Sequence, residues 1–211
     1  MKPMLQKSVL TLALAAGLVS LSGCFPLLVG GAVTGGVLVV SDRRTSGTVI
    51  EDNAIQLKAS NRVLDNLGER AHVNATSYNR QLLLTGEVPS EQDKQLVEKV
   101  VSGIENVRSV VNELAVLGNS TFAQRSSDAL VTSRVKANLV DAKDLFANAF
   151  KVTTERGTVY LMGRVSQREA NRATEVITGT EGVQRLVRIL EIVSEEELAR
   201  MTPPPAPEPK K

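Results

Sequence analysis

The chain has 211 residues, of which 42% are apolar and 23% are charged, and its formal net charge is +2. This composition is that of a globular protein and excludes a mainly disordered chain. Aromatic residues make up only 3%, with no Trp, so we expect an aliphatic core and too few stacking groups for nucleic-acid binding. The single cysteine excludes an internal disulfide.

The N-terminal segment has the pattern of an export signal. Lys2 and Lys7 precede an apolar run from Ser8 to Leu21, which is too short to span a ~30 Å hydrocarbon core. The run ends in Leu21-Ser22-Gly23-Cys24, which resembles the lipobox of bacterial lipoproteins. The resemblance implies that residues 1–23 are a cleaved signal peptide and that Cys24 carries a diacylglyceryl group and further acylation of the palmitate type. An ordinary signal peptide followed by a chance cysteine leaves unexplained why the only cysteine stands here.

Two segments outside the central part of the chain have biased compositions. Residues 24–46 are rich in Gly and end in a polar stretch, so we expect a lipidated, flexible tether. Residues 194–211 end in a Pro-rich, charged sequence that cannot bury a core, so we expect a disordered tail.

The central part of the chain is duplicated. The segment Leu82–Val88 resembles Val159–Val165, and their glycines, Gly86 and Gly163, lie 77 residues apart. A period of this length that occurs twice indicates two copies of a small domain rather than a solenoid. We place the copies at residues 47–118 and 119–193.

Each copy has the same predicted order of elements, α-β-β-α-β. The first helix of each copy is predicted at Asn53–Leu67 and at Asp128–Val140, with Asn53 and Asp128 as N-caps. The remaining elements are predicted at 72–77, 82–86, 90–102 and 107–116, and at 150–154, 158–163, 167–178 and 183–192. A hairpin followed by a helical crossover predicts an α+β fold, with both helices packed on one face of a mixed three-stranded sheet.

The motifs together resemble a known family. A hairpin that ends in Leu-x-Gly-x-Val, a helix and a Gly-x-x-x-Val start to the last strand resemble the BON domain, and two copies behind a lipobox resemble the dual-BON outer-membrane lipoproteins. The resemblance implies a non-enzymatic protein without a cofactor, anchored in the outer membrane and facing the periplasm. It further implies support of outer-membrane integrity and binding of an anionic, phosphatidylglycerol-like phospholipid by the first helix of the second domain.

Charge gives an independent reason to assign the lipid contact to the second domain. Residues 47–118 carry 7 basic and 10 acidic side chains, a net −3, whereas residues 119–193 carry 11 and 8, a net +3. Basic residues are attracted to anionic bilayers. On the first helix of this domain Val131, Val135 and Leu139 are expected to face the sheet. The predicted phospholipid-binding residues on the rest of this helix are Leu130, Ser133, Arg134, Lys136 and Ala137.

Other readings of these features stay open. The helix can be a solvated one on which Leu130 covers the edge of the core, and the protein can be an adaptor for an envelope or cell-division partner. The opposite domain charges favour docking of the two domains, whereas the linker Gly118-Asn119-Ser120 permits motion. His72, the only histidine, has no Cys or second His beside it, so neither a metal site nor catalysis is expected.

Overall fold

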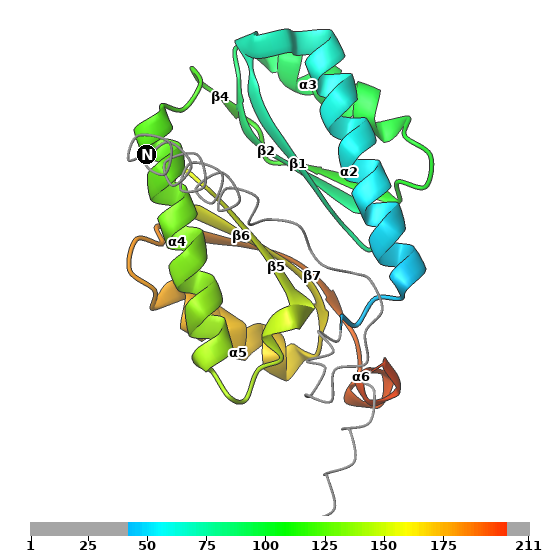
Figure 1. Ribbon diagram of the computed structural model, residues 1–211, viewed down its shortest axis with the longest axis vertical. Helices are drawn as coiled ribbons and strands as arrows, with labels where there is room; N and C mark the ends of the chain where they lie inside the picture. Colours follow the sequence, from blue (N-terminus) through cyan, green and yellow to red (C-terminus); the bar gives the residue numbers. More distant parts are fainter. Residues whose placement is uncertain (1–41, 202–211) are drawn as a thin grey trace, which may run out of the picture. The chain divides into compact units, whose positions relative to one another are not determined.

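The computed structural model describes residues 42–201, which all lie within one compact unit, Val40–Lys211. Figure 1 shows two successive sets of helices and strands in this part of the chain. The predicted signal peptide, Cys24, residues 24–41 of the expected tether and residues 202–211 of the expected tail lie outside the described residues.

The order of elements in both copies confirms the predicted α+β class. The first copy contains α2 (Ser46–Leu67), a 3-10 turn (Gly68–Arg70), β1 (His72–Tyr78), β2 (Gln81–Val88), α3 (Glu91–Ser102), β3 (Ser109–Asn112) and β4 (Ala115–Val116). The second contains α4 (Phe122–Asp141), a 3-10 turn (Ala147–Ala149), β5 (Phe150–Glu155), β6 (Thr158–Val165), α5 (Gln167–Thr178) and β7 (Arg185–Ile192), and α6 (Glu195–Met201) follows.

The last strand of the first copy differs from the single strand predicted over 107–116. It is divided into β3 and β4, both of which pair with β2 in parallel. At the break the Asn112 side chain accepts a hydrogen bond from the N–H of Leu114, at 3.2 Å, and Leu114 is buried in the core. The local side-chain bond thus competes with the ladder and interrupts the strand.

The first helix of each copy begins about one to two turns earlier than predicted, and the predicted N-caps are wrong. The hydroxyl of Thr45 accepts from the N–H of Thr48, and that of Thr121 accepts from the N–H of Gln124 in a capping box. These threonines satisfy free N–H groups at the helix ends. Asp128, the predicted cap of the second helix, is instead a buried residue within α4.

Each copy builds its sheet around a hairpin with a two-residue turn. β1 pairs with β2 and β5 with β6 in antiparallel fashion, and the last strand then pairs in parallel with β2 or β6. The turn residues Asn79-Arg80 have φ of 48° and 63°, and Arg156-Gly157 have 48° and 71°. Two successive positive φ values are typical of a type I′ turn, whose twist matches that of the strands.

A buried aspartate on the first helix holds each of these turns. The carboxylate of Asp52 accepts the N–H groups of Asn79 and Arg80, both at 2.7 Å. The carboxylate of Asp128 accepts those of Arg156 and Gly157, both at 2.8 Å. Because a carboxylate leaves water only when it gains strong partners, this pair of bonds fixes the helix against the tip of the hairpin.

Both helices of each copy cover the same face of its sheet, as predicted. Leu82 and Leu84 of β2 pack into the core under α2 and α3, and Val159 and Leu161 of β6 pack under α4 and α5. The intervening side chains point to the opposite face. There they form one shared apolar cluster from both sheets, made of Tyr78, Leu83, Tyr160 and Met162 with Val111, Val187 and Ile189 around them.

The two domains therefore pack on each other through the sheet faces that their own helices leave open. Further bonds join them across this contact: the Tyr78 hydroxyl donates to the carbonyl of Ala149 at 3.3 Å, and Lys151 Nζ donates to the carbonyl of Ser77 at 3.1 Å. Of the two arrangements that the sequence left open, the structure has the docked one.

The residues just before α2 belong to the folded part and not to the expected tether over 24–46. Arg44 pairs with Asp42 and with buried Asp52 at 2.6 and 2.7 Å, and its guanidinium lies 4.2 Å from the Tyr78 ring. Arg43 reaches the second domain, where it binds both oxygens of buried Glu169 at 2.8 and 2.7 Å. The two arginines thus anchor the start of the folded part to both domains.

The chain just after the second domain also differs from the disordered tail predicted over 194–211. Residues 195–201 form α6, at whose start Ser194 Oγ accepts the N–H of Glu197. Glu197 pairs with Arg164 at 2.6 Å, and Leu198 is buried. Arg168 also pairs with Glu195 at 3.6 Å, so burial of Leu198 and two ion pairs with the second domain order this segment, which composition alone assigned to the tail.

We predict that Asp128→Ala destabilises the protein by about 2–3 kcal/mol, because it leaves two N–H groups of the β5–β6 turn without partners. Urea denaturation followed by circular dichroism measures this loss. Asp141→Ala, at the exposed end of the same helix, is the control and is expected to change stability little. Equal effects of the two substitutions would contradict the proposed role of Asp128.

Candidate functional site

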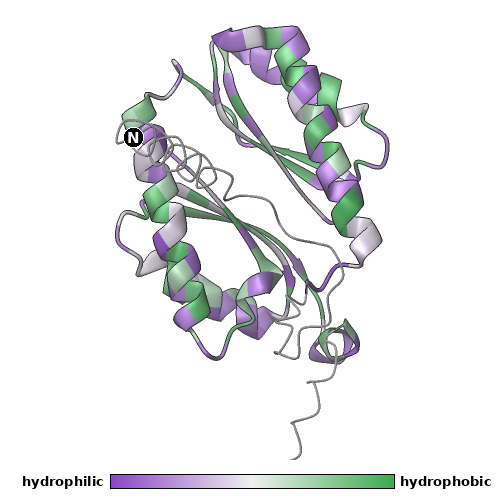
Figure 2. Cartoon of the chain, viewed as in Figure 1, coloured by the Kyte–Doolittle hydropathy of each residue, from purple (hydrophilic) through white to green (hydrophobic). Residues whose placement is uncertain are grey.

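The candidate site is the outward face of α4. Val131, Val135 and Leu139 are buried against the sheet, as predicted, so the opposite side of the helix faces solvent. Figure 2 shows apolar and polar colouring alternating along this helix.

The predicted site residues all lie on the exposed surface of α4, but they do not form one tight cluster. Leu130 is 61% exposed, and Ser133 and Ala137 lie exposed on the same side of the helix. At 100° per residue, Arg134 and Lys136 fall on opposite flanks of this side. The Ser133 hydroxyl donates to the carbonyl of Ala129 at 2.9 Å, so only its lone pairs remain for another group.

Two apolar residues on this face escaped the sequence analysis. Phe122, the first residue of α4, is 80% exposed, and Val140, near its other end, is 59% exposed. Helical periodicity places both on the same side as Ser133. The predicted start at Asp128 left Phe122 outside the helix. The available signal was the Thr121-x-x-Gln124 pattern, which is typical of a capping box and predicts the earlier start.

The exposed charged residues of α4 are basic up to its last residue, Asp141. Between Phe122 and Val140 the only acidic residue is Asp128, which is buried and bound to the β5–β6 turn. Arg125, Arg134 and Lys136 are exposed over the same length. Arg134 has only a long, exposed ion pair with Glu181 at 3.8 Å. Exposed ion pairs of this kind contribute little to stability, so the Arg134 guanidinium can leave Glu181 and bind another anionic group.

Two shallow hollows lie beside α4, each next to one of the basic residues on its flanks. One hollow, of about 320 Å³, is lined by Leu130, Arg134, Gly157 and Gly182 among others. A Cβ on Gly182 would lie 2.7 Å from a methyl of Val131, so a side chain there would disturb this hollow. The other, of about 290 Å³, is lined by Lys136, Val140 and Phe150 among others.

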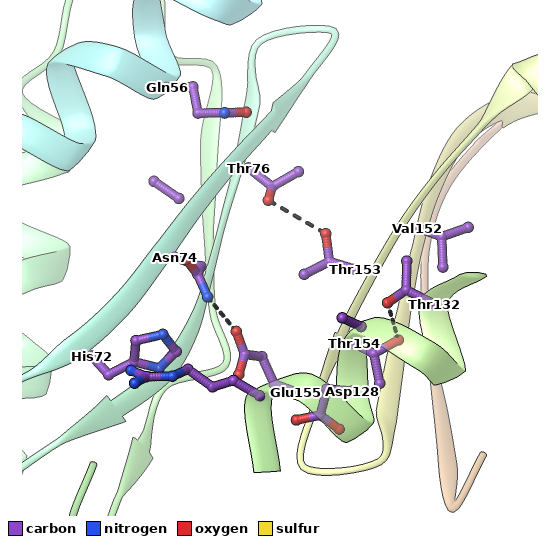
Figure 3. Close-up of a pocket in the computed structure, with 13 residues that line it drawn as sticks. Gln56, His72, Asn74, Thr76, Asp128, Thr132, Val152, Thr153, Thr154 and Glu155 are labelled. Carbon is purple, nitrogen blue, oxygen red and sulfur yellow. Dashed lines mark hydrogen bonds between the residues drawn. The ribbon is translucent and has the colours of Figure 1, made fainter. Parts of the chain in front are cut away.

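A larger hollow than these two, of about 440 Å³, lies instead between the two domains. Its polar side chains bond one another: Asn74 donates to Glu155, Thr76 contacts Thr153, and Thr132 donates to Thr154 (Figure 3). Burial raises the pKa of Glu155, and the nearby carboxylates of Glu87 and Asp128 raise it further, against the hydrogen bond from Asn74. An anionic ligand is therefore disfavoured at this end of the hollow.

The described residues contain one group that could hold a metal ion, at the edge of this hollow. The ligand atoms of His72, Glu87 and Glu155 lie within 4.8 Å of one another. Fully buried Glu87, however, already accepts from Arg156 at 2.6 Å and from the N–H of Ser120 at 3.1 Å. A guanidinium in this position opposes a second cation, so the group fits an ion-pair network between the domains better than a metal centre.

The pKa of Glu87 is consistent with that network. Burial alone would raise this pKa, but hydrogen bonds from Arg156, from the N–H of Ser120 and from His72 outweigh burial and hold it below its usual range. Glu87 therefore stays ionised and joins the first domain, the linker at Ser120 and the second domain through Arg156.

Comparison with known proteins gives the family. The BON domain model matches residues 51–118 and 127–193. The chain is 35% identical to the outer membrane lipoprotein DolP of Haemophilus influenzae over 171 residues, which cover 80% of this chain and 88% of that protein. It is 28% identical to the osmotically-inducible protein Y of Escherichia coli, over 71% of this chain and 76% of that protein.

Two further proteins also align with the chain. The 21 kDa hemolysin of Actinobacillus pleuropneumoniae is 28% identical over 72% of this chain and 79% of its own length. A solved structure of CdsD, a structural protein of the type III secretion system of Chlamydia trachomatis, aligns with 72% of this chain and 96% of its own at 15% identity. Its TM-score of 0.29 is too low to support any argument.

The chain belongs to the BON-domain family, as a member with two BON domains. Within that family it is DolP-like, and it is an outer-membrane lipoprotein. Within residues 42–201, no helix has both the length and the apolar character needed to cross a membrane.

We predict that Glu155→Gln stabilises the protein at pH 8 and not at pH 4. The raised pKa of Glu155 means that folding disfavours its ionised form, so the wild type loses stability as pH rises from the unfolded value toward the folded one. The neutral Gln amide of the variant can still accept a hydrogen bond from Asn74, and because it does not ionise the variant keeps its stability at high pH. We expect a gain of a few degrees in Tm at pH 8. Thermal melts at both pH values measure it, with exposed Glu105→Gln as control. An equal gain at pH 4 would contradict this explanation.

Proposed function

We propose that this protein is a lipoprotein attached through Cys24 to the outer membrane, facing the periplasm, and that α4 binds anionic phospholipid there and supports membrane integrity. We further propose that it has no enzymatic activity, since the relatives named above bear no enzyme names. The observation that carries the lipid contact is the outward face of α4, where exposed apolar residues lie between basic flanks and the exposed carboxylate of the helix, that of Asp141, stands only at its last residue.

The chemistry of this face suits a headgroup region. Phe122, Leu130 and Val140 can enter the boundary between headgroups and acyl chains, where an apolar helix face gains free energy. Arg134 and Lys136 can then bind phosphate oxygens, and a guanidinium can do so with two hydrogen bonds. Small residues such as Ala137 allow the helix to approach the surface closely.

The proposed anchor strengthens a weak contact. A lipid on Cys24 keeps the second domain near the bilayer, so that headgroup binding becomes effectively intramolecular. Each basic residue near an anionic surface contributes about 1 kcal/mol, and this contribution falls off within a Debye length. Headgroup contacts by α4 are therefore expected to set the position of the domains rather than to retain the protein on the membrane.

Vesicle binding by residues 40–211, which form one compact unit, tests the proposal without the anchor. We expect binding to phosphatidylglycerol vesicles that weakens with salt, and little binding to phosphatidylcholine. Leu130→Glu removes apolar insertion, and Arg134→Ala combined with Lys136→Ala removes charge attraction. Each loss is worth about 1–2 kcal/mol, so each variant is expected to bind the vesicles about tenfold more weakly. Vesicle flotation measures the bound fraction.

The chain offers a matched control on the equivalent helix of the first domain. Leu57 of α2 is 64% exposed, close to the 61% of Leu130, so Leu57→Glu introduces the same charge on a similarly exposed surface. We expect it to leave vesicle binding unchanged. If Leu130→Glu has no more effect than Leu57→Glu, the lipid contact of α4 is excluded, and the adaptor role for an envelope or division partner becomes the better hypothesis.

A further inference from the structure

The α2 helix of the first domain carries a second apolar stripe that its own domain does not use. Its inner face, with Ile55, Ala59 and Val63, is buried in the core. On the opposite side Ile50, Leu57 and Leu64 are 69%, 64% and 60% exposed. Apolar colouring recurs along the whole length of this helix in Figure 2.

The spacing of this stripe is that of a coiled-coil seam. Ile50, Leu57 and Leu64 are each seven residues apart, and Ala54 and Asn61 stand between them. The five positions alternate in steps of four and three, so they occupy successive d and a positions of three heptads. Apolar residues at d and a lone Asn at one a position are typical of parallel helix pairs, in which the Asn side chains bond each other and fix the register.

We infer that this stripe pairs with the same stripe of a second copy of the chain, with the two α2 helices parallel and in register. The partner is thus a second copy, and Leu57 of one protomer lies beside Leu57 of the other. Nothing in this pairing depends on the lipid contact of α4.

The charges that border the stripe favour the parallel orientation. Glu51, Lys58 and Asp65 occupy the e positions, and the g positions hold neutral Asn53 and Ser60. In a parallel pair each g residue faces an e residue of the partner, which brings Asn53 to Lys58 and Ser60 to Asp65 of the second copy without like charges. An antiparallel pair would place Lys58 against Lys58 and Glu51 against Asp65.

The same charges argue against a membrane as the occupant. Two of the three charged residues bordering the stripe are acidic, whereas the exposed charged residues of α4 are basic up to Asp141, its last residue. Acidic side chains are repelled by an anionic bilayer surface. The two equivalent helices therefore present different outer faces: α4 fits anionic headgroups, and α2 fits another copy of itself.

The position of α2 in the chain agrees with the parallel pair. The helix begins at Ser46, so a parallel pair brings the segments that join α2 to the proposed anchor at Cys24 to the same end in both copies. Two chains anchored in the same membrane have these segments on the same side, as a parallel pair requires. One helix seam is smaller than the ~1,000 Å² of a stable interface, so we expect a weak dimer that forms mainly where chains are concentrated.

Cysteine cross-linking of the full chain in its own membranes tests the inference. Ile50→Cys, Leu57→Cys and Leu64→Cys, made one at a time, are each expected to give a disulfide-linked homodimer, because a parallel register sets every position against itself. The control is Leu117→Cys, which is 49% exposed in the same domain outside α2 and is expected to stay at the background of the unsubstituted chain.

Each other outcome overturns the inference in a defined way. No homodimer from any of the three variants excludes the pairing, and cross-links to a different protein assign the stripe to that partner. A homodimer from Leu57→Cys alone, with Ile50→Cys linking only to Leu64→Cys, would show the antiparallel pair.

A second substitution separates loss of pairing from loss of folding. Adding Leu57→Asp to Leu64→Cys is expected to abolish the homodimer while leaving the Tm of residues 40–211 unchanged, because the Leu57 side chain is largely exposed. Loss of cross-linking together with a lower Tm would mean unfolding.

Discussion

A buried carboxylate on the first helix of each domain is the interaction on which the rest of the fold depends. Asp52 and Asp128 each leave water and accept the two N–H groups at the tip of the domain's hairpin. A type I′ turn directs these donors outward, and a carboxylate is the acceptor best suited to take both. The helix is thereby set across its sheet, and the last helix and strand of the domain complete the same core.

This arrangement leaves one face of each sheet uncovered, and the two domains solve that problem for each other. Their shared cluster around Tyr78, Leu83, Tyr160 and Met162 buries both faces, while polar bonds surround it. Glu87 and the Arg43–Glu169 pair lie where the sequence segments of both domains meet. Removing one partner of such a pair would strand a buried charge, so these contacts favour one fixed arrangement of the domains.

The same constraint shapes the surface that we propose to meet the membrane. Because Asp128 is turned inward to hold a hairpin, α4 exposes basic residues and no acidic residue of its own before Asp141. Asp52 is turned inward in the same way on α2, yet Glu51 and Asp65 remain at the border of its outer stripe. Duplication thus preserved the inner contacts of the two helices, and their outer faces differ in chemistry.

The sequence by itself determined the duplication, the α-β-β-α-β order, the family and the inward face of α4, because these rest on local periodicity and on repeated glycines. It placed Leu130 and Arg134 on the outside for the same reason. Only the tertiary structure decided the role of Asp128, the anchoring by Arg43 and the packing of sheet on sheet. Leu83 of β2 packs against Tyr160 and Met162, which lie about 80 residues away along the chain, and no local pattern identifies such a contact.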